Sequence, residues 1–153
     1  MTSTATTTHI TEVGTVFVPV ADQDRALAFY VDTLGFEKRV DFAYGDGSRW
    51  IELAPPGATN TISLVSSSEG TPVGGDQTSC AFSTADIEAD HATLRAADVV
   101  VDEQIARTGT PRAGLVSTDA IVPDPVPAQF FFRDPDGNRF LIVQPELAEG
   151  DER

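Results

Sequence analysis

The sequence predicts an α+β fold in which two tandem β-α-β-β-β modules form a concave, cup-shaped mixed sheet. Three observations lead to this prediction: an internal repeat, one helical segment among short strands in each copy, and a sheet face that no helix covers. The repeat is seen in TVFVPVADQDRALAFYVDTLGF, which begins at Thr15, and in SCAFSTADIEADHATLRAADVV, which begins at Ser79. An Asp follows the first strand of each copy, and the offset from Asp22 to Asp86 is 64 residues.

The two expected helices begin directly after these aspartates. Asp is a favoured N-cap, and acidic residues in the first helical turn suit the helix dipole. In the first helix, Ala26, Tyr30 and Leu34 recur every four residues and predict one apolar face. Ile87 and Leu94 mark the apolar face of the second helix.

Three further strands are expected in each module, because β-branched and aromatic runs alternate with turn signals. In the first module these strands lie near 38–44, 50–54 and 61–65, separated by GDGS and PPGATN. In the second module they lie near 99–105, 129–133 and 139–144, and DPDGN joins the last two.

The chain is expected to form a single domain, because a four-stranded sheet with one helix leaves its other face to be covered. The domain spans 12–146, and a polar, Gly-rich linker separates a module at 12–68 from a module at 77–146. Residues 1–11 form a flexible N-terminal tail, and residues 147–153 form an acidic C-terminal tail.

Composition and charge exclude several function classes. Hydrophobic residues make up 41% and charged residues 22% of the chain, which is typical of a globular protein. A formal net charge of −14 disfavours binding to nucleic acid or to an anionic membrane. The N-terminus lacks the features of a signal peptide, and no apolar run approaches the roughly 20 residues that span a bilayer. With one cysteine, Cys80, the chain suits a reducing compartment, and we expect a cytoplasmic protein.

The paired modules, the segment VPVADQDRALAFYVDTLGF and the segment FFFRDPDGNRFLIVQ resemble the vicinal oxygen chelate superfamily over about 12–146. Its members include glyoxalase I, extradiol dioxygenases, fosfomycin-modifying enzymes and bleomycin-resistance proteins. The resemblance implies the glyoxalase/bleomycin-resistance fold. It does not select a function, because this scaffold hosts lyases, isomerases, oxygenases and non-catalytic binders.

In metal-dependent members of this superfamily, His and Glu side chains from the first and last strand of each module bind a divalent ion. The resemblance places these four positions at Thr15, Ser63, Ser79 and Leu141. Neutral hydroxyls are poor ligands for zinc, nickel or iron, and leucine is no ligand. We therefore expect neither a metal nor another cofactor. The chain has two histidines; one lies in the N-terminal tail and the other on the second helix, so neither is expected to bind a metal.

Strand alternation predicts which side chains line the cup. Aromatic rings, several hydroxyls, one carboxylate and one guanidinium should face inward, as in a site for a partly apolar organic molecule. Alternatively, the aromatic rings fill space between the modules or at a dimer interface. The expected ligand-binding residues are Thr15, Phe17, Trp50, Ser63, Ser79, Phe131, Arg139 and Leu141.

Glu52 is the candidate catalytic residue. A carboxylate beside Trp50 in an apolar cup suits a general base. Alternatively, Glu52 pairs with Arg49 or Arg139, or lies at a wet rim. Tyr44 is a further candidate hydrogen-bond donor.

The second module carries an insertion. Ser63 and Leu141 are 78 residues apart, which is 14 more than the repeat of 64 requires. The extra residues fall in the Gly- and Pro-rich segment 107–127, which we expect to be a lid over the cup or a loop that embraces a second subunit.

Three functions are consistent with these features. The first is a metal-independent protein of the sequestration or resistance type, expected as a homodimer, that binds a small organic molecule, cationic ligands included. The second is an enzyme of the same superfamily, a lyase, isomerase, epimerase, hydrolase or dioxygenase-like enzyme, that uses Glu52 or an unrecognised metal site. The third is an accessory subunit or small-molecule sensor without catalytic activity.

Overall fold

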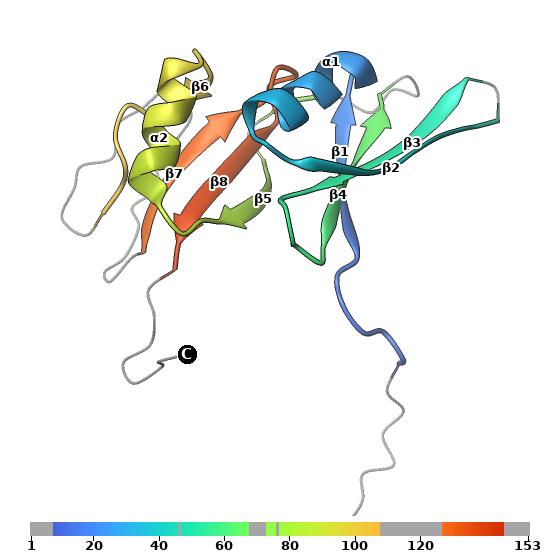
Figure 1. Cartoon of the computed structure of the whole chain (residues 1–153), viewed down its shortest axis with the longest axis horizontal. Helices are drawn as coiled ribbons and strands as arrows, with labels where there is room; N and C mark the ends of the chain where they lie inside the picture. Colours follow the sequence, from blue (N-terminus) through green and yellow to red (C-terminus); the bar gives the residue numbers. More distant parts are fainter. Residues whose placement is uncertain (1–7, 46, 68–72, 76, 108–126, 146–153) are drawn as a thin grey trace, which may run out of the picture.

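The computed structural model describes residues 8–45, 47–67, 73–75, 77–107 and 127–145 (Figure 1). The first module contains one strand, a helix that continues as a π-helical turn, and three further strands. The second contains one strand, a helix and three strands. In chain order the elements are β1 (Thr15–Val20), α1 (Gln23–Ala28), η1 (Phe29–Thr33), β2 (Glu37–Tyr44), β3 (Ser48–Ala54), β4 (Thr61–Ser66), β5 (Thr78–Ser83), α2 (Ile87–Ala96), β6 (Val100–Val101), β7 (Ala128–Arg133) and β8 (Arg139–Gln144).

These elements form two four-stranded mixed sheets, with the orders β1-β4-β3-β2 and β5-β8-β7-β6. In each sheet the first and last strand of the module pair in parallel, and the remaining neighbours are antiparallel. The predicted α+β fold of two β-α-β-β-β modules is therefore confirmed.

β6 is shorter than the sequence predicts, because the expected strand at 99–105 pairs regularly with β7 only at Val100 and Val101. Beyond them the buried Asp102 carboxylate accepts a hydrogen bond from the Phe131 amide at 2.9 Å. The Asp102 side chain thus accepts the hydrogen bond of a β7 amide that a backbone carbonyl would accept in regular strand pairing. The Asp102 amide still donates to the Phe131 carbonyl at 3.0 Å, and farther along the chain an isolated bridge joins Ala106 and Gln129.

Both helix starts follow the predicted capping pattern. The Asp22 carboxylate accepts from the Arg25 amide at 3.1 Å, and the Asp86 carboxylate accepts from the Ala89 amide at 3.0 Å. The first helix then widens into η1, where the Leu34 amide donates to the Phe29 carbonyl at 3.1 Å. The single helical run expected from the sequence is therefore an α-helix followed by a π-helical turn.

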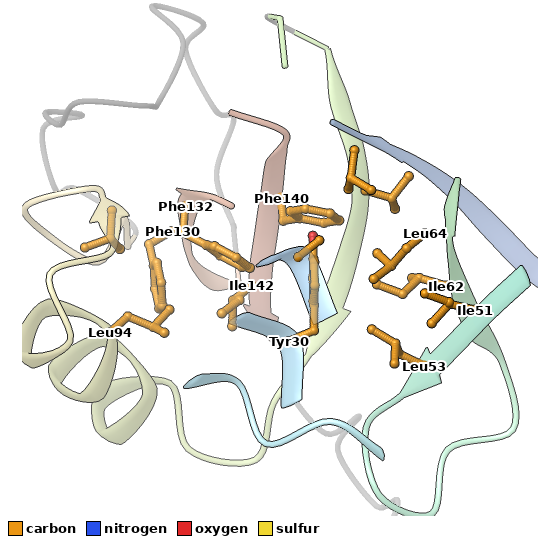
Figure 2. Close-up of a cluster of buried hydrophobic side chains, with 14 of the residues drawn as sticks. Tyr30, Ile51, Leu53, Ile62, Leu64, Leu94, Phe130, Phe132, Phe140 and Ile142 are labelled. Carbon is orange, nitrogen blue, oxygen red and sulfur yellow. The ribbon is translucent and has the colours of Figure 1, made fainter. Parts of the chain in front are cut away.

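The two modules share one hydrophobic core on the helix side of their sheets. Tyr30 lies at its centre, and Figure 2 shows side chains of the first sheet and of β8 converging on it. Its ring lies 6.1 Å from Phe140, and Phe36 contacts Phe82 at 5.3 Å between ring centroids. The α1–η1 segment therefore packs against both sheets, and among the described residues no helix covers the other face of either sheet.

Hydrogen bonds from β1, α1 and η1 to the β7–β8 turn connect the modules, and we call this group the junction clamp. The buried Tyr30 hydroxyl donates to Asp134 at 2.7 Å, and Arg25 pairs with Asp136 at 2.8 Å. The Asn138 amide group donates to the Pro19 carbonyl at 2.8 Å. Burial, reinforced by the neighbouring Asp134 carboxylate, raises the pKa of Tyr30 well above its ordinary value. The DPDGN turn thus connects the modules in addition to joining two strands.

Candidate ligand-binding site

The helix-free face of the first sheet gathers most of the predicted inward-facing residues. Across the strands, Phe17 lies opposite Ser63, and Ser63 lies opposite Glu52. Cross-strand partners point to the same face of a sheet, and so do residues two positions apart along a strand. Trp50 therefore shares this face with Glu52, and Phe42 joins it as the partner of Trp50.

Hydrogen bonds fix the polar side chains on this face. The Trp50 indole N–H donates to Glu52 Oε2 at 2.6 Å, and the Thr61 hydroxyl donates to Glu52 Oε1 at 3.0 Å. The Thr15 and Ser63 hydroxyls share a hydrogen bond of 2.7 Å. Each oxygen of the Glu52 carboxylate accepts one of these bonds. Glu52 therefore orients the Trp50 ring and holds Thr61, the first residue of β4, beside it.

The alternative pairing of Glu52 with Arg49 is wrong, because Arg49 is engaged by other carboxylates. Its guanidinium binds Asp41 at 2.8 Å and Asp24 at 2.6 Å. Hydrogen bonding to Arg49 holds the pKa of Asp41 well below its usual range. The register also places Arg49 one residue from Trp50, on the opposite face of β3.

Four aromatic residues form an exposed surface above this polar base, and we call Phe17, Phe42, Tyr44 and Trp50 the aromatic wall. Phe17, Phe42 and Tyr44 are 60%, 54% and 50% exposed. The Phe17 ring meets the Trp50 ring edge-on at 5.9 Å, and Phe42 lies 6.3 Å from Tyr44. Contiguous exposed apolar surface of this kind is typical of ligand or protein interaction sites.

On the helix-free face of the second sheet, the aromatic ring and the guanidinium are buried against each other. The Arg139 guanidinium lies over the Phe131 ring at 5.1 Å and donates to the Thr78 hydroxyl at 3.2 Å. Phe131 and Arg139 are only 8% and 7% exposed. The guanidinium expected to line an open cup is therefore packed against an aromatic ring.

Leu141 and Ser79 are the remaining ligand-binding candidates of the second module. They differ in whether strand alternation could assign their side chains to a face of the sheet. Leu141 lies between Ala81 and Phe131 on neighbouring strands, as strand alternation predicts. Ser79 lies at an irregularity of the β5–β8 register, so alternation alone could not assign its face.

The residues at the positions where the resemblance places metal ligands do not fit a divalent ion. Thr15 and Ser63 are neutral hydroxyls bonded to each other, and Ser63 is fully buried. Leu141 offers only hydrocarbon. In the part of the chain that the structure describes, no group of three or more His, Cys, Asp or Glu side chains is placed to hold a metal ion. No catalytic step through a metal follows from this donor set.

His91 lies on α2, as expected, and its Nε2 bonds to the Asp102 carbonyl at 2.8 Å. Burial raises the pKa of the Cys80 thiol to about 11, so the unreactive protonated form dominates at neutral pH.

Sequence reasoning missed Phe42, although its spacing of two from Tyr44 could have placed it on the same face. The segment 107–127 was expected to be a lid or a dimer loop. Its residues 108–126 lie outside the described residues.

Comparison with known proteins agrees with this fold. The family model for the Glyoxalase/Bleomycin resistance protein/Dioxygenase superfamily matches residues 8–142, and the chain belongs to that superfamily. Among solved structures, it resembles TnmS3, an antibiotic binding protein from Streptomyces sp. CB03234. The two are 33% identical with a TM-score of 0.71, over 92% of this chain and 100% of that protein.

A superfamily member from Sphaerobacter thermophilus DSM 20745 is also similar, with 30% identity and a TM-score of 0.72 over 89% of this chain and 98% of that one. The uncharacterised protein YetH of Bacillus subtilis is 38% identical over 53 residues, which is 35% of this chain and 44% of that protein. The match thus covers less than half of the length of YetH.

Among the described residues, no helix is long and apolar enough to cross a membrane.

Proposed function

We propose that this protein is a metal-independent binding protein of the sequestration or resistance type, which binds a small, partly apolar organic molecule on the helix-free face of the first sheet. The observation that carries this proposal is the exposed aromatic wall, in which Trp50 is held by a hydrogen bond to Glu52. A relative described as an antibiotic binding protein supports it. The single cysteine supports a cytoplasmic location.

The wall and its polar base have complementary roles in this proposal. The rings of Phe17 and Trp50 remove apolar surface of the ligand from water, which is the main source of affinity. A carboxylate has about four acceptor positions, and Glu52 uses two of them internally, so it can still accept a bond from a ligand donor. Ring faces beside a carboxylate also suit a cation, and a net charge of −14 attracts cations.

We also propose that a second copy of the chain completes the site in a homodimer. A cavity of about 420 Å³ between the modules is lined by Thr61, Cys80 and their neighbours and by no residue of the aromatic wall. The wall by itself is a surface, whereas a small-molecule site must enclose its ligand. A partner subunit, together with segment 107–127 as a lid or dimer contact, would enclose it.

The first test is metal content followed by a ligand screen. Untagged protein purified without chelator is analysed by mass spectrometry, and far less than one ion per chain is expected. Antibiotics and aromatic amines are then screened by thermal shift and by fluorescence of Trp50, the single tryptophan. One tightly held ion per chain contradicts the metal-independent proposal, and a screen in which no compound quenches Trp50 contradicts the placement of the site.

An enzyme that uses Glu52 as a general base is the second candidate. Its support is the position of the carboxylate beside the aromatic wall, within reach of a bound molecule. The two internal hydrogen bonds of Glu52 favour the binding function, because they give the carboxylate a structural role in orienting Trp50 and Thr61. Turnover of a ligand that Glu52→Gln abolishes without loss of binding would establish the enzyme instead.

A further inference from the structure

A second cavity lies on the helix side of the molecule, away from the aromatic wall. Its volume is about 200 Å³, and it opens between the end of η1 and α2. Both modules line it, which makes it a feature of the assembled core. Figure 2 shows three of its apolar residues, Leu94 on α2, Phe132 on β7 and Ile142 on β8. Phe36 and Phe82, which contact each other edge-on, complete the apolar part.

The polar part of the cavity is formed by the carboxylate of Asp90 and by hydroxyl groups. The Thr84 hydroxyl donates a short hydrogen bond to Asp90 Oδ2 and accepts one from the Asp86 amide at 3.1 Å. Within the described residues, no hydrogen bond reaches Asp90 Oδ1. One carboxylate oxygen therefore remains able to accept a bond from a molecule in the cavity.

Charge and size restrict what this cavity can hold. Its lining contains one acidic side chain, Asp90, and no lysine, arginine or histidine. A cation would meet a complementary charge there, whereas an anion would be repelled. A volume of 200 Å³ corresponds to about seven water molecules in the liquid, so the occupant is a small molecule.

The backbone beside the cavity is unusual. Thr33 ends the π-helical turn and Leu34 caps it, and both residues line the cavity. π-helical turns are rare and occur frequently at functional sites. Here the wider turn ends at the rim of the cavity, next to the residues that would meet a ligand.

We propose that this cavity is a second ligand site, which binds a small organic ammonium ion. The hydrocarbon body packs against Phe36, Phe82 and Leu94, and the ammonium group donates to Asp90 Oδ1. This inference does not rest on the function proposed for the aromatic wall, because the two sites share no residue.

The probe is 2-phenylethylammonium, added to the full chain at neutral pH and followed by two-dimensional amide NMR. Saturable shifts are expected for the amides around Thr84, Asp90 and Leu34. The neutral isostere 2-phenylethanol should bind about tenfold more weakly, because a hydrogen bond between charged groups is lost. Asp90→Asn should weaken binding of the ammonium ion by a similar factor while keeping an acceptor for Thr84.

Glu88→Gln is the matched control, because it removes one negative charge from the same exposed helix without touching the cavity. It should change the dissociation constant less than about twofold, as expected for a screened surface charge. Thr93→Phe, at an exposed lining position, should block the cavity if Asp90→Asn fails to fold. Shifts confined to the Trp50 indole, equal binding of the neutral isostere, or unchanged binding to folded Asp90→Asn or Thr93→Phe would each overturn the proposal.

Discussion

The two modules have the same order of elements but present different helix-free faces. At one pair of equivalent positions, Phe17 lies opposite Ser63 in the first module, whereas Ala81 lies opposite Leu141 in the second. The first face exposes aromatic rings above a hydrogen-bonded carboxylate, whereas the second buries Arg139 against an aromatic ring. A duplicated fold can therefore expose aromatic rings on one copy while the equivalent face of the other copy buries its aromatic ring.

The helix-side faces of the modules also differ, although both are apolar. The first sheet contributes aliphatic residues such as Ile51 and Leu53, and the second contributes Phe130, Phe132 and Phe140. Phe132 and Phe140 stack at 5.4 Å, and Tyr30 of the first module contacts Phe140. The aromatic half of the core thus receives the helix of the other module, so the loss of one ring there should affect both modules.

The largest expected effect is on stability. Phe140→Ala removes a fully buried ring from the shared core and should lower the free energy of unfolding by about 3–5 kcal/mol. Phe42→Ala, which removes an exposed ring from the aromatic wall, is the matched control and should change stability by less than about 0.5 kcal/mol. Urea unfolding followed by circular dichroism measures both. Equal losses would mean that the wall is part of the core.

A smaller loss is expected when the junction clamp is broken. Tyr30→Phe keeps the ring but removes a donor from the buried Asp134 carboxylate, which should cost about 1–3 kcal/mol. Tyr44→Phe removes an exposed hydroxyl and should cost little. Urea unfolding distinguishes them, and a Tyr30→Phe protein as stable as the parent would show that the clamp does not hold the modules together.

Ligand affinity should respond to the first helix-free face. With a ligand found by the screen, Phe17→Ala should weaken binding about tenfold, because truncation of a buried aromatic contact commonly costs more than 1 kcal/mol. Val100→Ala removes an exposed apolar side chain from the second sheet outside the aromatic wall and should leave affinity unchanged. Isothermal titration calorimetry measures both dissociation constants, and equal losses would place the site elsewhere.

The smallest expected effect separates the charge of Glu52 from its role in orienting Trp50. Glu52→Gln keeps an acceptor beside Trp50 and should weaken binding of a cationic ligand about threefold to fivefold, the size expected of a partly exposed ion pair. A neutral ligand should be unaffected. Titrations at low and high salt test this difference, since salt screening should abolish the effect of the substitution. A loss that is equal for both ligands would show that Glu52 acts only by orienting Trp50.

Local patterns in the sequence were sufficient for both helix starts and for most residues of the first helix-free face, whereas the short β6, the π-helical turn and Phe42 were missed. Asp22 and Asp86 marked both helix starts, because an N-cap depends on amides only a few residues away. Alternation along regular strands placed Thr15, Ser63 and Glu52 on one face, because successive side chains of a strand point to opposite sides. Where the register is irregular, as at Ser79, the same argument could not assign a face.

The sequence by itself thus determined the repeat, the order of strands and helices, and the residue types at Thr15, Ser63, Ser79 and Leu141, none of which is a histidine or a carboxylate. Only the tertiary structure decided that Tyr30 would bond to Asp134, 104 residues away, and that Arg139 would be buried against Phe131. It also decided that Glu52 would hold Trp50 and not pair with Arg49. The physical reason is that periodicity and capping act within a few residues, whereas burial and side-chain pairing depend on which distant segments meet in space.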